Sequence, residues 1–370
     1  MTRIAFFGDL SYVGASEWVG FLSTVADFDV HVLVFPEDRR DLPGVTVHTL
    51  PGGPSGGKGR YLTCVPALRR LVRRVAPDVL IAYRVVSFGF SASMTGFHPL
   101  VLAAQGQFIA PRTGPYFLRL FARHAVRRAD LIHSWAPPMT ASLVALGADP
   151  ARILTLTRGV DERRFHFGGE PPPPLTLVTT RQLEPYYNVP TLLKAVKRVS
   201  AACPVRFLIA GEGGARRDLE AAARDLGLGE VVTFLGSVSR ERLPDLLRSA
   251  HLYVSAVPSD GTSASLLEAM AAGVVPIVTD NESNRHWIAD GEGGRLVPAF
   301  DERAYAEAIV RGWEAPEWRR QVRTANRAAV EARASWTRNM AFFAEAYRAV
   351  AAGRPVPPRG GGDSLREGAS

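Results

Sequence analysis

Residues 251–273 read HLYVSAVPSDGTSASLLEAMAAG, and the fold is decided by this stretch. It begins with an apolar run, His251 to Val257, whose Val and Tyr content predicts a buried strand. The composition of Pro258 to Gly261 predicts a turn. Good capping residues at 262–265 then predict a helix that runs to a stop at Gly273. A strand, a Gly/Ser-rich turn and a helix N-terminus together predict an anion-binding site.

Two carboxylates flank the predicted turn. Asp260 stands at its mouth, and Glu268 follows inside the predicted helix. Such a cradle suits a phosphate group, and two carboxylates beside it could bind sugar hydroxyls. A purely structural interpretation also fits, because a Ser-capped helix with an acidic residue in its early turns is a common source of stability. The pattern of residues alone leaves both interpretations open.

The stretch resembles the signature of the retaining nucleotide-sugar glycosyltransferases of family 4. That signature is Glu-Gly-Phe-Gly, four further residues, and then Glu-Ala-Met-Ala-x-Gly-x-Pro-Val. This chain has DGTS at 260–263, EAMAAG at 268–273 and PIV at 276–278. Residues 290–297 match a further family pattern, Asp-Gly-x-x-Gly-x-Leu-Val. The first acidic residue is therefore Asp in place of Glu, and Thr-Ser replaces Phe-Gly.

The resemblance implies a GT-B fold: two Rossmann-like α/β domains that face a central cleft, with a C-terminal helix crossing back to the first domain. Strand and helix patterns alternate in both halves of the chain, which is typical of βαβ units on parallel sheets. We expect a first, acceptor domain at 1–162, a linker at 163–174, a second, donor domain at 175–334, the crossover helix at 335–352 and a disordered tail at 353–370.

The resemblance also implies a set of site residues. Asp260 and Arg181 are expected to be catalytic: Asp260 would contact the donor sugar, and the guanidinium fork of Arg181 would hold the diphosphate. Glu268 would accept hydrogen bonds from the ribose hydroxyls of the donor. The remaining residues expected to bind the donor are Gly261, Thr262, Ser263, Ala264, Ser265, Leu266, Tyr187, Gly211, Gly236, Ser237 and Val238. The residues expected to contact the acceptor or the sugar are Gly14, Ala15 and Gln105.

Two positions depart from the family pattern. The family has a Lys five or six residues after the Arg that corresponds to Arg181, where this chain has Tyr187 and Asn188, so Arg181 would carry more of the positive charge. Many relatives have a His where this chain has Gln105. An amide can hydrogen-bond a sugar hydroxyl but cannot exchange a proton near neutral pH. Gln105 is therefore expected to bind and not to act as an acid or base.

These features predict a retaining glycosyltransferase that moves a sugar, expected to be a hexose, from a nucleoside diphosphate to an acceptor hydroxyl on a glycan, a glycolipid or a small-molecule glycoside. Helix N–H groups and Arg181 would supply the positive charge, so no metal and no cofactor is expected besides the nucleotide-sugar substrate. A nucleotide-sugar epimerase and a non-catalytic sugar-nucleotide-binding protein stay open as alternatives. A retaining phosphorylase is disfavoured because none of the lysines, Lys58, Lys194 and Lys197, is suitably placed to hold pyridoxal phosphate.

Composition and charge limit the expected location of the protein and the kinds of partner it binds. The chain has two cysteines, Cys64 and Cys203, so a disulfide framework is excluded. No apolar run has the length of a membrane span and the N-terminus lacks a signal-peptide pattern, which together predict a cytoplasmic protein. Residues 1–160 contain 17 Lys/Arg against 10 Asp/Glu, which predicts an anionic partner for this half. Residues 115–126 could form an amphipathic helix that rests on the anionic inner face of a membrane or packs on the sheet. No nucleic-acid partner is expected.

Overall fold

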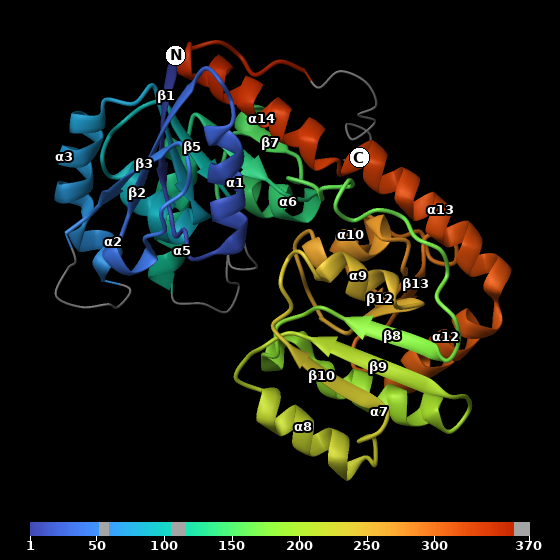
Figure 1. Ribbon diagram of the computed structural model, residues 1–370. Coiled ribbons are helices and arrows are strands. Elements are labelled where there is room, and N and C mark those ends of the chain that lie inside the picture. The colour runs from blue at the N-terminus through green and yellow to red at the C-terminus, as the bar shows by residue number, and fades with distance from the viewer. Residues whose placement is uncertain (52–58, 105–115, 359–370) are drawn as a thin grey trace. The chain divides into compact units, whose positions relative to one another are not determined.

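The structure of the protein is a computed structural model that describes residues 1–51, 59–104 and 116–358. The chain forms two compact units: Met1–Thr157 together with the residues from Arg338 onward, and Arg158–Thr337. Each unit contains one parallel sheet with helices on its faces (Figure 1). The predicted fold class, two Rossmann-like α/β domains, is therefore confirmed.

The sheet of the first unit has the strand order β3-β2-β1-β4-β5-β6-β7, and all of its strand pairs are parallel. Its strands are β1 (Thr2–Phe7), β2 (Phe28–Val34), β3 (Val45–Thr49), β4 (Val79–Tyr83), β5 (Leu100–Ala103), β6 (Leu131–Ser134) and β7 (Ile153–Thr155). The order reverses between β1 and β4. The carboxyl ends of these two strands form a topological switch point, which is where open α/β sheets bind ligands.

The helices of the first unit connect these strands, and the last helix of the chain joins them. They are α1 (Val13–Ser23), α2 (Arg60–Thr63), α3 (Val65–Val75), a π-helix at Arg84–Gly89, α4 (Phe90–Ser93), α5 (Tyr116–Arg128), α6 (Pro137–Ala145) and α14 (Trp336–Ala351). On α14, the rings of Phe343 and Tyr347 stack on His133 of β6, with centroids 4.5 and 5.3 Å apart. The expected return of the C-terminal helix to the first domain is confirmed.

Helix α5 is the amphipathic helix predicted at 115–126. Its Ala122, Ala125 and Val126 are buried, whereas Phe117 and Leu120 are 50% and 47% exposed. One side of α5 thus packs within the first unit, whereas two other large apolar side chains of the helix stay half exposed. Among the helices of the described chain, none combines the length and apolar character needed to cross a membrane.

The sheet of the second unit has the strand order β10-β9-β8-β11-β12-β13 and is also parallel throughout. Its strands are β8 (Leu175–Thr179), β9 (Val205–Ala210), β10 (Val232–Gly236), β11 (Leu252–Ser255), β12 (Val275–Thr279) and β13 (Arg295–Val297). Its helices are α7 (Val189–Ser200), α8 (Arg216–Asp225), α9 (Leu243–Arg248), α10 (Ala264–Ala271), α11 (Glu282–Arg285), α12 (Glu302–Glu314) and α13 (Pro316–Arg333), with a 3-10 turn at Pro185–Tyr187. The order of this sheet reverses between β8 and β11.

The core of the second unit follows the alternation of side chains along its strands. In β8, Leu175 and Leu177 pack into the cluster shared with α7 and α12. Val178 faces the opposite side, where it joins Leu267 of α10 and Leu247 of α9. Figure 1 shows α7 and α8 on one face of this sheet and α9 and α10 on the other. The buried side chains of α10 thereby pack the helix against this face of the sheet.

The segment 163–174, expected as a linker, lies within the second unit. Arginines of α13 hold it there. Arg319 pairs with Glu170 at 2.5 Å, and Arg323 donates to the carbonyl oxygen of Gly168 at 2.5 Å. Because these guanidinium groups bind the irregular backbone of the segment, it packs as part of the second unit.

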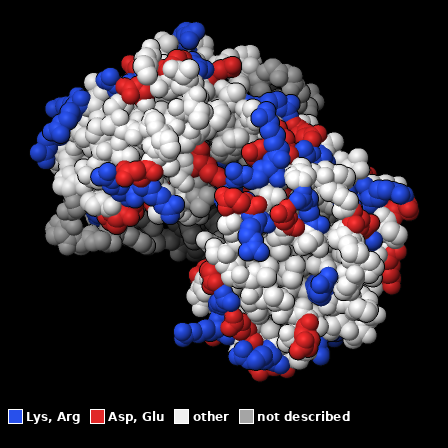
Figure 2. Space-filling view, in the orientation of Figure 1, with Lys and Arg blue, Asp and Glu red and all other residues white. Residues whose placement is uncertain are grey.

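Surface charge is mixed in sign. On the face drawn in Figure 2, Lys and Arg side chains lie beside Asp and Glu side chains in several clusters. Several such neighbours form ion pairs, as Arg348 does with Asp27 in the first unit and Arg216 with Glu220 in the second. Within the first 160 residues, Arg3 pairs with Asp29 and Arg60 with Glu37, so part of the positive charge of this half is neutralised locally.

Candidate functional site

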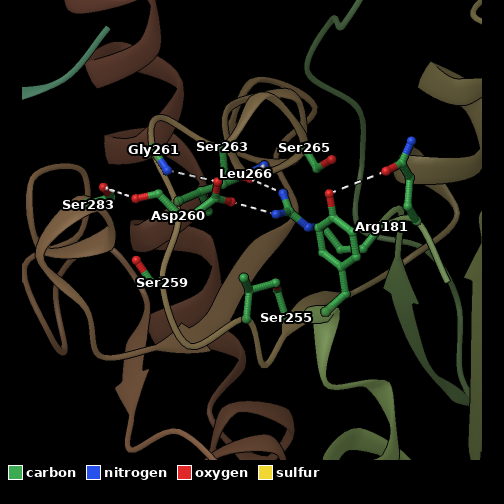
Figure 3. A network of polar contacts seen from close by, with 12 residues as sticks. Arg181, Ser255, Ser259, Asp260, Gly261, Ser263, Ser265, Leu266 and Ser283 are labelled. Carbon is green, nitrogen blue, oxygen red and sulfur yellow. Dashed lines mark hydrogen bonds and ion pairs between the residues drawn. The ribbon is translucent and has the colours of Figure 1, made fainter. Parts of the chain in front are cut away.

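The candidate site lies at the switch point of the second sheet. Arg181 follows β8, and the turn at 258–263 follows β11, so the two segments meet at the carboxyl edge of neighbouring strands. Figure 3 shows the side chain of Arg181 pointing toward Asp260 and Ser263. Open α/β sheets bind their ligands at this place.

Ser263 is the N-cap of α10. Its backbone is extended, with φ −73° and ψ 110°, and its Oγ accepts from the N–H of Leu266 at 3.2 Å. The preceding N–H groups, those of Ala264 and Ser265, lie in the first turn and have no acceptor within the helix. These N–H groups and the positive end of the helix dipole together favour an anion. The predicted helix start is thus present: Ser263 caps the helix, and Asp260 lies in the turn just before this cap.

The turn before α10 is fixed by hydrogen bonds to Asp260. Its Oδ1 accepts from the N–H of Gly261 at 2.8 Å, and its carbonyl oxygen accepts from the hydroxyl of Ser283 at 2.6 Å. Both contacts are visible in Figure 3. They hold the Asp260 side chain on the side of Arg181.

Arg181 binds both of its predicted neighbours in the site. Its Nη2 donates to Oδ2 of Asp260 at 2.5 Å, and its Nη1 donates to Oγ of Ser263 at 2.6 Å. The side chain is 9% exposed, and the ring of Tyr187 lies 4.8 Å from the guanidinium carbon. Burial opposes the charged form of Arg181, but the Asp260 carboxylate outweighs it, so the pKa of the guanidinium is raised above its ordinary value. The two residues expected to be catalytic form one buried ion pair.

Two buried polar atoms beside this pair have no partner among the described residues: Nε of Arg181 and the hydroxyl of Thr180. A buried donor without an acceptor costs about 1–3 kcal/mol. The Arg181 side chain therefore gains from any ligand or rearrangement that brings an acceptor to its Nε.

Glu268 lies on α10, and it also pairs with an arginine. Its side chain is 7% exposed, and its Oε1 lies 3.1 Å from Nη1 of Arg240. The sequence interpretation assigned Gly236, Ser237 and Val238 to this loop and missed Arg240. The available signal was a basic residue two positions after Val238, in a loop already expected to contact the donor.

The glycines after β9 and at the end of β10 shape the backbone around Arg181. A Cβ on Gly211 would lie 2.1 Å from the carbonyl oxygen of Arg181, so a side chain there would displace the segment that carries this residue. The N–H of Gly211 donates to the carbonyl oxygen of Gly236 at 2.8 Å, and Gly236 has a φ of +71°. These two glycines thus permit the loops that follow β8, β9 and β10 to approach one another closely.

The remaining predicted residues lie in different parts of the chain. Ser265 donates from its Oγ to the carbonyl oxygen of Thr180 at 3.2 Å, and Thr262 lies in the turn before the cap. Gly14 and Ala15 lie in the first turn of α1, in the first unit. Gln105 lies outside the described residues.

Where the family has a lysine, this chain has Asn188, which makes an uncharged hydrogen bond. Asn188 adopts a left-handed conformation with φ 52°, and its Nδ2 donates to the carbonyl oxygen of Ala256 at 3.1 Å. It ties the start of α7 to the end of β11. Within the described ranges, no group of three or more His, Cys, Asp or Glu residues is placed to hold a metal ion.

Comparison with known families matches both halves of the chain. Residues 3–135 match the model described as glycosyl transferase 4-like, and residues 161–329 match glycosyl transferases group 1. A D-inositol 3-phosphate glycosyltransferase from Catenulispora acidiphila is 31% identical over 246 residues, covering 60% of this chain and 56% of that protein. A phosphatidyl-myo-inositol mannosyltransferase from Mycolicibacterium smegmatis is 33% identical over 203 residues, covering 53% and 49%. The chain thus spans about half the length of these curated relatives.

Solved structures share the fold of both units. Sucrose-phosphate synthase from Thermosynechococcus elongatus has a TM-score of 0.82 at 18% identity, covering 95% of this chain and 100% of that one. Anabaena HepE in complex with UDP-glucose has a TM-score of 0.77 at 16% identity, covering 93% and 99%. At these identities the likeness concerns the fold, which is GT-B.

Proposed function

Because both halves of this GT-B chain match glycosyltransferase families, we propose that the protein transfers a sugar from a nucleoside diphosphate to an acceptor hydroxyl with retention of anomeric configuration. The observation that carries the proposal is the buried network of Arg181, Asp260 and Ser263 at the N-terminus of α10. It combines a fixed cation, a carboxylate and helix N–H groups at the switch point of the sheet that matches the group 1 family.

Each part of this network has a role in the proposed reaction. The bond between the anomeric carbon and the β-phosphate oxygen breaks, and negative charge develops on the departing diphosphate. The acceptor oxygen bonds to the anomeric carbon, and its proton passes to the diphosphate. The N–H groups of Ala264 and Ser265 and the Arg181 guanidinium stabilise that charge, because they are already oriented and need no reorganisation. Asp260 binds a hydroxyl of the donor sugar. A metal ion is not required in this scheme, since these groups supply the positive charge.

The ion pair between Arg181 and Asp260 also links the ligand binding of one residue to that of the other. In the structure the carboxylate pairs with the guanidinium at 2.5 Å and neutralises it. A diphosphate that binds Arg181 competes for the same fork, so donor binding loosens the pair and frees the Asp260 carboxylate for the sugar. Donor sugar and diphosphate are therefore recognised together in this proposal, and Tyr187 shields the pair from solvent in place of the missing lysine.

The nucleoside part of the donor is assigned to α10 and the loop after β10. Glu268 accepts from the ribose hydroxyls, and residues 236–238 contact the base. Anabaena HepE has been solved with UDP-glucose, so uridine nucleotides are the first donors to test. Relatives named for inositol phosphate and phosphatidylinositol make polyols and their lipids suitable first acceptors beside glycans.

A panel of nucleotide sugars tests the proposal, with and without an acceptor mixture of glycans, glycosides and inositol compounds. We expect acceptor-dependent release of nucleoside diphosphate and a product with the anomeric configuration of the donor. An inverted product would contradict retention. Nucleotide release with an isomerised sugar and no acceptor would indicate an epimerase, and binding without any turnover would indicate a non-catalytic protein.

A further inference from the structure

Arg240 and Glu268 form a second ion pair that neither the sequence pattern nor the proposed reaction explains. Arg240 lies in the turn between β10 and α9, and Glu268 lies on α10. The Nη1–Oε1 distance is 3.1 Å. The carboxylate side chain is 7% exposed, while the arginine side chain is 33% exposed. A largely buried acid is thus held by a cation that reaches it from the loop assigned to the nucleobase.

A buried carboxylate has few ways to stay charged. Without a partner, the cost of desolvation favours its neutral form. A neutral carboxyl group accepts hydrogen bonds more weakly and has one oxygen that donates instead. The hydrogen bond from Nη1 of Arg240 to Oε1 also restricts how the carboxylate can turn, because it anchors one of the two oxygens. Arg240 therefore affects both the charge and the orientation of Glu268.

We propose that Arg240 is the positioning residue that makes the nucleoside subsite selective for ribonucleotides. It holds Glu268 ionised and oriented so that the vicinal hydroxyls of a ribose can donate to the carboxylate. This inference rests on the proposed function, in which Glu268 binds the ribose. It adds the residue that gives this contact its selectivity and the ligand class that the subsite takes, a ribonucleoside diphosphate in preference to its 2′-deoxy counterpart.

A purely structural role for the pair makes a different prediction. If Arg240 only tied its turn to α10, its removal would weaken the fold and reduce the affinity for ribose and deoxyribose nucleotides by the same factor. A positioning role changes the ratio of the two affinities, because only the ribose carries the 2′-hydroxyl. The ratio therefore separates the two roles even where stability also changes.

The experiment measures binding by calorimetry for UDP, GDP and ADP, each beside its 2′-deoxy form. The variants are Arg240→Ala and Arg240→Lys, with Arg242→Ala as the matched control, since Arg242 is an exposed arginine in the same turn. For the base that binds best, we expect wild type and Arg242→Ala to prefer the ribonucleotide by about 10- to 100-fold, the range of a charge-assisted hydrogen bond. Arg240→Ala should reduce this preference to about threefold or less, and Arg240→Lys should keep an intermediate value.

Each outcome decides between the assignments. A wild type that binds none of the nucleotides overturns the proposed function, and the inference with it. A wild type that binds them without preferring ribose overturns the role of Glu268 on which Arg240 depends. A ribose preference that persists in Arg240→Ala overturns only the inference. Should Arg240→Ala fail to fold, the ratio in Arg240→Gln decides: an unchanged ratio contradicts the inference, because glutamine has no positive charge to keep Glu268 ionised.

Discussion

Two arginines occupy comparable places in the two sheets. Arg84 follows β4 and Arg181 follows β8, and both strands lie at the switch point of their sheet. Each guanidinium carbon lies near the ring of a tyrosine, 5.0 Å from that of Tyr12 and 4.8 Å from that of Tyr187. Arg181 is buried and paired with Asp260, whereas Arg84 is only partly buried. Each switch point thus carries an arginine beside a tyrosine, but β4 and β8 lie on opposite sides of their switch points and the two arginines have different environments.

The helices that begin near these arginines differ as well. Helix α1 starts after Tyr12 without a side-chain cap, while α10 starts after Ser263, whose hydroxyl both caps the helix and binds Arg181. The topology supplies an edge suited to ligands in both units. The residues placed on that edge decide which ligand is bound, and the second unit has the set suited to a diphosphate.

Removal of the Asp260 side chain should have the largest effect on the difference between the two sheet edges. Asp260→Ala is expected to lower turnover by about 10- to 1,000-fold, since one positioned polar contact to the transition state is worth a few kcal/mol. It also leaves Arg181 buried without its partner, which costs about 3–5 kcal/mol of stability. Asp260→Asn, which keeps the shape of the side chain, controls for unfolding. Turnover is measured as nucleotide release from the preferred donor.

Two further variants at acidic positions sharpen this test. Asp260→Glu moves the carboxylate by about 1.5 Å and should alter the ranking of donor sugars more than the maximal rate. Asp9→Ala removes an acid at the carboxyl end of β1, where it accepts from the N–H of Ser11 at 2.8 Å. Donor affinity should be unchanged in Asp9→Ala. Indifference of turnover to Asp260→Ala would reduce this carboxylate to a turn residue.

Substitution of Glu268 should affect donor binding more than chemistry. Glu268→Gln removes the negative charge that accepts from ribose, so we expect donor affinity to fall by about 10- to 100-fold with turnover at saturation largely kept. Steady-state kinetics with varied donor concentration separate the two parameters. Retained donor affinity with a loss of turnover alone would contradict the assignment.

The sequence predicted much of the donor unit because its signals are local. The strand before Pro258, the Ser263 cap and the helix through Met270 each depend on a few neighbouring residues, and the structure has β11 and α10 there. The strand is shorter than predicted and ends at Ser255, although Ala256 and Val257 remain buried. The apolar run indicates burial, whereas the strand ends where pairing ends, and the last pair of β11 is Ser255 with Val278 of β12.

Contacts between distant segments were not predictable from spacing. The pairs Arg181–Asp260 and Arg240–Glu268 join residues 79 and 28 positions apart, and no periodic pattern connects them. The interpretation gave Arg181 and Asp260 separate ligands, and their direct bond appears only once β8 and β11 are neighbours. The packing of residues 163–174 on α13 was likewise hidden, because a Gly/Pro-rich composition indicates irregular backbone and not what holds it.

A smaller effect is expected from a buried histidine of the first unit. His133 is fully buried among aromatic rings, and burial lowers its pKa to about 3. The unfolded chain therefore takes up a proton first on acidification, so stability should fall as pH drops below about 6.5 and continue to fall toward the folded pKa. Each unit of pH in this window costs about 1.4 kcal/mol. His133→Phe keeps the ring stacking and should reduce the loss between pH 7 and pH 5.5 by about 1 kcal/mol.

Urea unfolding of wild type and His133→Phe at the two pH values measures this difference. His251 of the second unit serves as the comparison, since its Nδ1 accepts from the N–H of Thr176 at 3.0 Å and burial lowers its pKa as well. The His133→Phe protein should keep the acid sensitivity that His251 contributes. An identical loss of stability in wild type and variant would show that His133 is not responsible.

The central claim is that the second sheet edge, and not the first, binds the diphosphate of the donor. Calorimetry with nucleoside diphosphate tests it on wild type, Arg181→Ala and Arg84→Ala. We predict micromolar to sub-millimolar affinity for wild type, a loss of about 1.5–3 kcal/mol in Arg181→Ala, and less than a threefold change in Arg84→Ala. An unchanged affinity in a folded Arg181→Ala protein, or a greater loss in Arg84→Ala, would contradict the account.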